Sequence, residues 1–180
     1  MIKKFNIKGL VLISNRIFKD DRGLFFESFN QDKFNEIVGK PITFVQDNIS
    51  HSKKGVVRGL HFQKPPFAQG KLVQVLKGSV IDVAVDLRKK SPTYGQHIAV
   101  ELSAENNKMF WVPEGFAHGF SALEENTIFS YKCTNFYHAQ SEGSLLWNDA
   151  DLNIDWKVEQ PILSDKDLIS EKLTTFVSPF

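Results

Sequence analysis

The chain has 180 residues, of which 42% are apolar and 24% are charged, the proportions of a globular protein that can bury one sizeable core. Its 22 lysine and arginine residues nearly balance 21 aspartate and glutamate residues, so the overall charge favours neither nucleic acid nor an anionic membrane as a partner. With one cysteine, no apolar run of about 18 residues and no signal-like apolar core near the start, the sequence predicts a cytoplasmic protein without internal disulfides.

Short apolar stretches follow one another along the chain, separated by Gly, Pro, Asn and Asp, which is typical of strands and turns. In chain order, strands are predicted at Leu10–Ile13, Leu24–Phe29, Thr43–Ile49, Val56–Gln63, Lys71–Lys77, Ser79–Asp86, His97–Leu102, Lys108–Val112, Phe116–Ala122 and Thr127–Cys133. Helix is expected at Gln31–Val38 and in a short turn near the C-terminus, and a hairpin turn is expected at Gly78. Because closure removes exposed strand edges, the pattern predicts an all-β, cupin-type jelly-roll barrel that forms one domain over residues 1–180.

A metal site is the first possibility to weigh, because many cupin barrels hold a metal ion through several imidazoles and a carboxylate. One cupin signature, P-x-G-x-x-H, is present as Pro113–His118. The other requires a closely spaced H-x-H pair, and Gln63 stands where its second imidazole would be. A carboxamide is a poor substitute for imidazole on a transition metal. The sequence therefore predicts a barrel that works with protons, without a metal or another cofactor.

His61 and Lys71 are candidate catalytic residues because of the strand faces that they occupy. His61 shares a predicted face with Gly59 and Gln63, and polar groups on the inner face of a closed barrel need a purpose. Taken alone, His61 could equally be a packed or surface histidine. Lys71 shares its face with two valines of its own strand. It is therefore either a buried lysine with a functional role or a strand-end lysine whose ammonium reaches solvent.

Tyr131 alternates with Phe129 and Cys133 along its predicted strand, so its ring should point into the barrel. By itself, this pattern also fits an aromatic core residue with a satisfied hydroxyl. If His61 lies on the opposite wall, the imidazole could remove a proton from one side of a carbon and the phenol could return one to the other side. That is the geometry of epimerisation.

Asp167 allows two interpretations. The segment Ser164-Asp165-Lys166-Asp167 has the S-x-x-D form of a helix capping box, in which the carboxylate only satisfies a backbone N–H. Alternatively, Asp167 accepts the Nδ1 proton of His61, which would fix the tautomer of the imidazole and raise its basicity. Sequence spacing does not choose between the two.

Eight short segments match a known enzyme family in order and spacing: Asp21–Phe29, Gln46–Asn48, Arg58–Gln63, Ala68–Val73, Asp82–Arg88, Ser91–Thr93, Pro113–Phe120 and Leu163–Asp167. On these segments the chain resembles the dTDP-4-dehydrorhamnose 3,5-epimerases, metal-free cupin enzymes of dTDP-L-rhamnose synthesis. The resemblance implies that the protein converts dTDP-4-dehydro-6-deoxy-D-glucose to dTDP-4-dehydro-L-rhamnose by inverting C3 and C5. It further implies that His61 is the general base, Asp167 its orienting partner, Tyr131 the acid on the opposite face and Lys71 a donor near the ketone oxygen.

The same resemblance implies a set of residues that bind the sugar nucleotide. Arg22 and Arg58 would hold the diphosphate, since a guanidinium offers a forked match to phosphate oxygens. Contacts with the nucleotide or the sugar would come from Glu27, Gln46, Asn48, His118, Glu142 and Lys166, with Tyr137 stacked on thymine. Arg22 could instead be a turn residue that pairs with neighbouring carboxylates. Strict alternation places Arg58 and His61 on opposite strand faces, so we expect either a bulge at Gly59 or a phosphate site at the barrel rim.

The family is dimeric, with N-terminal strands that cross between subunits, so the resemblance implies a homodimer in which Arg22 and Glu27 serve the neighbouring site. Two other functions remain open on the residues alone. One is an epimerase that inverts a single centre of a related 4-keto-6-deoxy sugar nucleotide. The other is a non-catalytic cupin that only binds sugar nucleotides. Deuterium exchange at the sugar carbons distinguishes all three.

Overall fold

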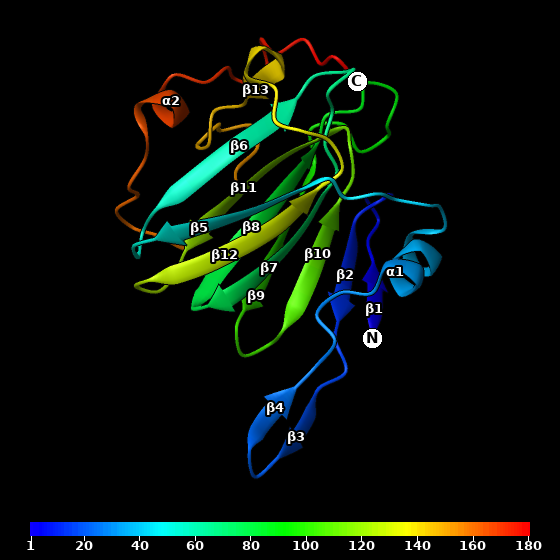
Figure 1. Cartoon of the computed structure of the whole chain (residues 1–180). Coiled ribbons are helices and arrows are strands. Elements are labelled where there is room, and N and C mark those ends of the chain that lie inside the picture. Colours follow the sequence, from blue (N-terminus) through cyan, green and yellow to red (C-terminus); the bar gives the residue numbers. More distant parts are fainter.

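The computed structural model describes residues 1–180 as two antiparallel sheets that face each other (Figure 1). The six-stranded sheet has the order β1 (Ile2–Lys4), β2 (Val11–Ser14), β10 (Lys108–Val112), β7 (Lys71–Lys77), β12 (Thr127–Cys133) and β5 (Gln46–Ser52). The five-stranded sheet has the order β13 (Glu142–Ser144), β6 (Val57–Gln63), β11 (Phe116–Ala122), β8 (Ser79–Asp86) and β9 (His97–Ser103). The predicted all-β, cupin-type fold is confirmed.

A separate hairpin and three short helices complete the chain: β3 (Phe18–Asp20), β4 (Gly23–Phe25), α1 (Gln31–Val38), the 3-10 turn η1 (Ala139–Ser141) and α2 (Asp165–Leu168). The β3–β4 hairpin extends away from the two sheets (Figure 1). Helix α1 begins at Asn30, whose side chain accepts a hydrogen bond from the Lys33 N–H, and ends at Gly39 in the left-handed conformation. None of these helices has the length and apolar character needed to cross a membrane.

Most predicted strands are present, with differences at a few ends and at one turn. The stretch predicted as Leu24–Phe29 is strand only to Phe25, and the one predicted as Thr43–Ile49 begins at Gln46. The hairpin predicted at Gly78 is wrong, because β7 and β8 lie in different sheets and do not pair. Gly78 instead turns the chain from one sheet to the other with φ of +77°.

The main core lies between the two sheets. It contains inward side chains from both, among them Val73, Val80, Phe110, Phe116 and Phe129, each of which is almost completely buried. The polar end of this interior, described below, carries the candidate active site.

Both sheets are also covered on their outer faces. Helix α1 packs Phe34 against Trp111 and Met109 of the six-stranded sheet. The C-terminal segment covers the five-stranded sheet, where Trp156 belongs to a second apolar cluster (Figure 1). Strands β8 and β11 are therefore covered on both faces, and they are buried along nearly their whole length rather than at alternate positions.

Asp86, at the end of β8, organises the turn that follows. Its buried carboxylate accepts hydrogen bonds from the Arg88 guanidinium at 2.7 and 2.8 Å and from the hydroxyls of Ser91 and Thr93 at 2.6 and 2.7 Å. Burial alone would raise the pKa of Asp86, but these donors outweigh it and lower the pKa from 3.8 to about 2.

The lowered pKa predicts an acid-dependent loss of stability. The contribution is complete above the unfolded value of 3.8 and is lost as the pH falls through the folded value of about 2. Asp86→Asn should therefore lower the free energy of unfolding at neutral pH by about 2 kcal/mol, with a difference from wild type that shrinks in acid. Denaturant unfolding across a pH series measures this, with Asp151→Asn on the surface as the control. A difference between wild type and Asp86→Asn that does not change with pH would contradict it.

Candidate active site

Two adjoining cavities lie at the polar end of the barrel interior, with volumes of about 270 and 220 Å³. His61, Lys71 and Tyr131 line both of them. The first cavity is also lined by Gln46, Asn48, Gln63, Tyr137 and Glu142, and the second by Ser50, Arg58, His118 and Asp167. The structure thus brings together most of the predicted site residues, although they come from distant parts of the chain.

A β-bulge in β6 places Arg58 and His61 on the same side. In the ladder with β11, His61 pairs with His118 and Arg58 pairs with Phe120, so two residues of β6 lie opposite the single Gly119. Gly59, within the bulge, has φ of +136°, and a Cβ there would lie only 2.6 Å from the Cα of Gly119. Of the two arrangements expected from the sequence, the bulge at Gly59 is present, and it requires glycine.

His61 pairs with the buried carboxylate of Asp167, which α2 brings to β6. The Nε2 to Oδ1 distance is 2.6 Å. Burial would raise the pKa of Asp167, but hydrogen bonds from His61 and Ser164 outweigh it and lower the pKa, so the carboxylate is ionised. His61 therefore donates its Nε2 proton to Asp167, and in the neutral form of the imidazole the lone pair is on Nδ1. The prediction that Nδ1 carries the bonded proton was wrong.

The capping interpretation of Asp167 is also partly correct. The Asp167 N–H donates to the Ser164 Oγ, which caps α2, and the Ser164 hydroxyl donates to Asp167 Oδ2 at 2.8 Å. The carboxylate therefore joins the histidine and the helix cap in one network. Such a network fixes the carboxylate and, through it, the imidazole.

Tyr131 and Lys71 come from neighbouring strands of the six-stranded sheet, β12 and β7, with Tyr131 opposite Val73 in the register. Burial raises the pKa of the Tyr131 hydroxyl, so the phenol is protonated at neutral pH and can act as an acid. Burial is also the main influence on Lys71 and lowers its pKa, although Asp82 and Glu142 nearby act in the opposite direction. Tyr131, Lys71 and the imidazole of His61 all line both cavities.

Asp82 is a site residue that sequence reasoning missed. It is fully buried in β8, and both of its carboxylate oxygens lie within hydrogen-bond distance of His118 Nε2, at 2.9 and 3.0 Å. A second aspartate–histidine pair thus supports the cavity, in addition to that of Asp167 and His61. The signal in the sequence was a charged residue in an otherwise apolar strand, where a buried carboxylate needs a partner.

The mouth of the first cavity is built from a hydrogen-bonded group of polar residues. The Tyr137 hydroxyl donates to Glu142 at 3.1 Å, and Glu142 forms an ion pair with Lys166. The Tyr137 N–H donates to Gln46 Oε1 at 2.9 Å, and Gln46 donates to Asn48 at 3.1 Å. Tyr137 as a whole residue is 58% exposed.

Gln63, which stands in place of a metal-binding histidine, has a structural role. Its amide nitrogen donates to the carbonyls of Phe67 and Phe136, at 2.6 and 3.1 Å, and its oxygen accepts from the His138 N–H at 2.8 Å. It therefore holds the loop that carries Tyr137. Nowhere in the chain do three His, Cys, Asp or Glu side chains gather in a way that could hold a metal ion.

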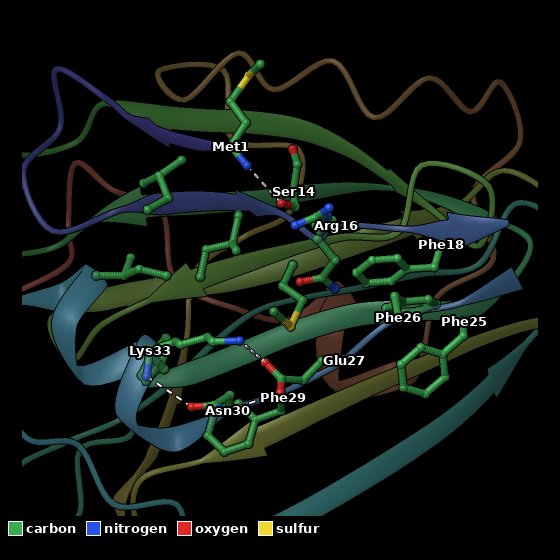
Figure 2. A pocket seen from close by; sticks show the side chains of 16 residues that line it. Met1, Ser14, Arg16, Phe18, Phe25, Phe26, Glu27, Phe29, Asn30 and Lys33 are labelled. Atoms are coloured by element: carbon green, nitrogen blue, oxygen red, sulfur yellow. Dashed lines mark hydrogen bonds and ion pairs between the residues drawn. The ribbon is translucent and has the colours of Figure 1, made fainter.

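Arg22 and Glu27 do not line either cavity of their own chain. Arg22 lies in the β3–β4 hairpin with its side chain 90% exposed and pairs with Asp20, as the local interpretation predicted. Glu27 pairs with Lys33 at 2.7 Å beside a mainly apolar cleft of about 670 Å³ (Figure 2). Figure 2 shows Phe18 and Phe25 of the hairpin and Phe29 near α1 around this cleft.

Comparison with known proteins agrees with the geometry. A family model described as dTDP-4-dehydrorhamnose 3,5-epimerase matches residues 4–175. The dTDP-4-dehydrorhamnose 3,5-epimerase of Salmonella typhimurium is 54% identical over 168 residues, 93% of this chain and 92% of that protein. The protein of the same name from Shigella flexneri is 52% identical over 169 residues, 94% and 93% of the two chains.

Among solved structures, the dTDP-6-deoxy-D-glucose-3,5-epimerase of Legionella pneumophila, in complex with dTDP-4-keto-L-rhamnose, matches with a TM-score of 0.94 and 48% identity. The match covers 98% of this chain and 94% of that one. The fold, the cavity residues and the similarity along nearly the whole length lead to one conclusion. This chain belongs to the dTDP-4-dehydrorhamnose 3,5-epimerase family.

Proposed function

We propose that this protein epimerises dTDP-4-dehydro-6-deoxy-D-glucose at C3 and C5 to give dTDP-4-dehydro-L-rhamnose, a step of dTDP-L-rhamnose synthesis. The observation that carries the proposal is the convergence of His61, Tyr131 and Lys71 on one pair of cavities, with Asp167 hydrogen-bonded to the imidazole. The relatives named for this activity match the chain over most of their length.

In the proposed reaction, Nδ1 of His61 removes the proton from the carbon next to the C4 ketone. The electron pair left behind forms an enolate, and its negative charge develops on the C4 oxygen, where Lys71 donates a hydrogen bond. Tyr131 then returns a proton to the opposite face of the carbon. Solvent reprotonates the phenolate and takes the proton from His61, which restores both groups for the next inversion. The ketone activates both neighbouring carbons, so one site can invert C3 and C5 in turn.

Tyr131→Phe should separate proton removal from inversion. Without the phenol, His61 can still remove a proton and return a solvent proton to the same face. We expect net epimerisation to fall by about 10²-fold or more while deuterium from D₂O still enters the sugar. Proton NMR of the substrate pool measures both rates, and loss of exchange in parallel with epimerisation would contradict the assignment of Tyr131 as the acid.

We propose the nucleotide-binding roles from the positions of the remaining polar groups. Arg58, at the second cavity, would hold the diphosphate. Tyr137 would stack on thymine at the mouth of the first cavity, where Gln46, Asn48, Glu142 and Lys166 form its hydrogen-bonded surround. His118 would contact the sugar from the floor of the second cavity.

We also propose a homodimer in which N-terminal strands cross between subunits, so that Arg22 and Glu27 complete the partner's site. Three features support it: the β3–β4 hairpin leaves its own barrel, Phe18, Leu24 and Phe25 on it are half-exposed or more, and an apolar cleft lies beside it. Exposed apolar groups that are gathered in one place are typical of an interface.

Co-expression of two inactive variants tests this crossing. His61→Ala and Arg22→Ala would each lack activity as homodimers, but a mixed dimer with crossed strands contains one complete site. Random pairing makes about half of the dimers mixed, so about a quarter of the wild-type activity should return. If Arg22 serves its own subunit, each site of the mixed dimer lacks one residue, and no activity returns.

The same residues provide base, acid and enolate stabilisation, so we propose that the single domain of residues 1–180 needs no metal or other cofactor and acts in the cytoplasm on a soluble sugar nucleotide. Assay after chelator treatment tests the first part. Full activity is expected, and activity that depends on added metal would contradict it.

A further inference from the structure

One face of β5 carries a row of polar side chains along the cavities. Gln46, Asn48, Ser50 and Ser52 alternate with more exposed residues of the opposite face. Three of the four are hydrogen-bonded within the protein: Gln46 accepts from Tyr137 N–H and donates to Asn48, and Ser52 Oγ accepts from Arg58 Nε at 3.3 Å. Ser50 is different, because its Oγ is the one buried side-chain nitrogen or oxygen of the chain without a hydrogen-bond partner.

The cavity at Ser50 contains the catalytic groups. Ser50 lines the cavity of about 220 Å³ together with Arg58, His61, Lys71 and Tyr131. A buried hydroxyl without a partner is costly and rare in folded proteins, so such groups at an active site mark a position where a ligand atom completes the bonding. The register places Ser50 opposite Phe129, between Ser52, which contacts Arg58, and Asn48, which pairs with Tyr131.

We propose that Ser50 determines sugar specificity by hydrogen bonding to the C2 hydroxyl of the hexose. The inference rests on the proposed function. In the proposed pose the diphosphate lies at Arg58 and the reacting carbons lie between His61 and Tyr131. The anomeric carbon C1 and its neighbour C2 then lie between the diphosphate and the reacting carbons. Of the two hydroxyls of a 4-keto-6-deoxyhexose, the one on C3 changes sides during the reaction. The C2 hydroxyl keeps its configuration, so a fixed serine can hold it in substrate, enolate and product.

The test compares wild type and Ser50→Ala, each with the natural substrate and with its 2-deoxy analogue, as a double-mutant cycle compares two changes. With the natural substrate, Ser50→Ala should lower kcat/KM by about tenfold, the usual effect of one lost hydrogen bond to a ligand. With the 2-deoxy sugar, wild type and variant should have equal kcat/KM, because the partner of the hydroxyl is absent. Affinity for dTDP alone, measured by calorimetry, should be unchanged in the variant.

Ser52→Ala is the matched control, since it changes the same face of the same strand at the residue that contacts Arg58. It should weaken dTDP binding and lower kcat/KM equally for both sugars. An equal loss with both sugars in Ser50→Ala, an unchanged kcat/KM with the natural substrate, or weaker dTDP binding would overturn the assignment to C2. Failure of the proposed function has a different signature, because wild-type protein would then bind the sugar nucleotide without turning it over.

Discussion

His61→Ala is expected to abolish deuterium exchange at both C3 and C5 and to lower epimerisation by about 10³-fold. The reason is that Nδ1 of this imidazole is the proposed base for both steps, whereas the other histidine of the cavity, His118, is paired with Asp82 and assigned to sugar binding. The ionised Asp167 would remain, but it is buried and its Oδ2 accepts a hydrogen bond from Ser164. NMR in D₂O measures both exchange rates in one experiment.

The matched control is His51→Ala, which removes an exposed histidine from the neighbouring strand β5 and should leave both rates at wild-type values. Binding of dTDP should survive in both variants, since the imidazole of His61 is assigned to the sugar. Exchange at one carbon with a wild-type rate in His61→Ala would show that a second base exists. Full activity would refute the assignment altogether.

Lys71→Met is expected to have the second largest effect, a fall in kcat of about 10²-fold. In the proposed reaction Lys71 donates to the ketone oxygen where enolate charge develops, so removal of this donor should slow proton removal at C3 and C5 alike. Stability should not fall, because burial disfavours the charged form of Lys71 and methionine has a similar length without that penalty. A variant with lower activity and an equal or higher melting temperature is the expected combination.

Lys77→Met, at the exposed end of the same strand, is the control and should change neither activity nor fold. A Lys71→Met protein that turns over normally would remove Lys71 from the mechanism. If instead kcat stays constant and KM rises, the lysine contributes to binding and not to the enolate.

The sequence predicted much of the barrel because its strands are well marked. β7, β8, β10, β11, β12 and α1 have the predicted bounds, since a Gly, Pro or Asn lies directly next to at least one end of each. The sequence predicted less well where the outcome depends on which strands pair with each other. The turn at Gly78 was correct as a turn, but whether the next strand pairs with the last one or joins the other sheet depends on packing far from the turn.

In the candidate active site, too, some features could be predicted from the sequence and others could not. Strand alternation correctly placed Lys71 and Tyr131 on inward faces. The strict alternation that separated Arg58 from His61 left a bulge at Gly59 as one of two possibilities, and the structure has that bulge. Alternation could not show which imidazole nitrogen meets Asp167, because the two residues are 106 positions apart and the answer depends on how α2 packs on β6.

Asp82 was missed for a related reason. It lies in an apolar strand, and its importance appears only when His118 of the adjacent strand is seen beside it. Arg22 and Glu27 illustrate a further limit, since the chain by itself places them outside both cavities and assigns them local ion pairs. Pairing between strands and between subunits is a property of the assembled protein rather than of any one segment.

The most direct test of the central claim is proton NMR of dTDP-4-keto-6-deoxyglucose with chelator-treated protein in D₂O, following the C3 and C5 signals. Both signals should disappear as deuterium enters, and dTDP-4-keto-L-rhamnose should form. Exchange at one carbon alone would point to an epimerase of a single centre. Exchange at neither carbon, with binding demonstrated, would contradict the catalytic account and leave a protein that only binds the sugar nucleotide.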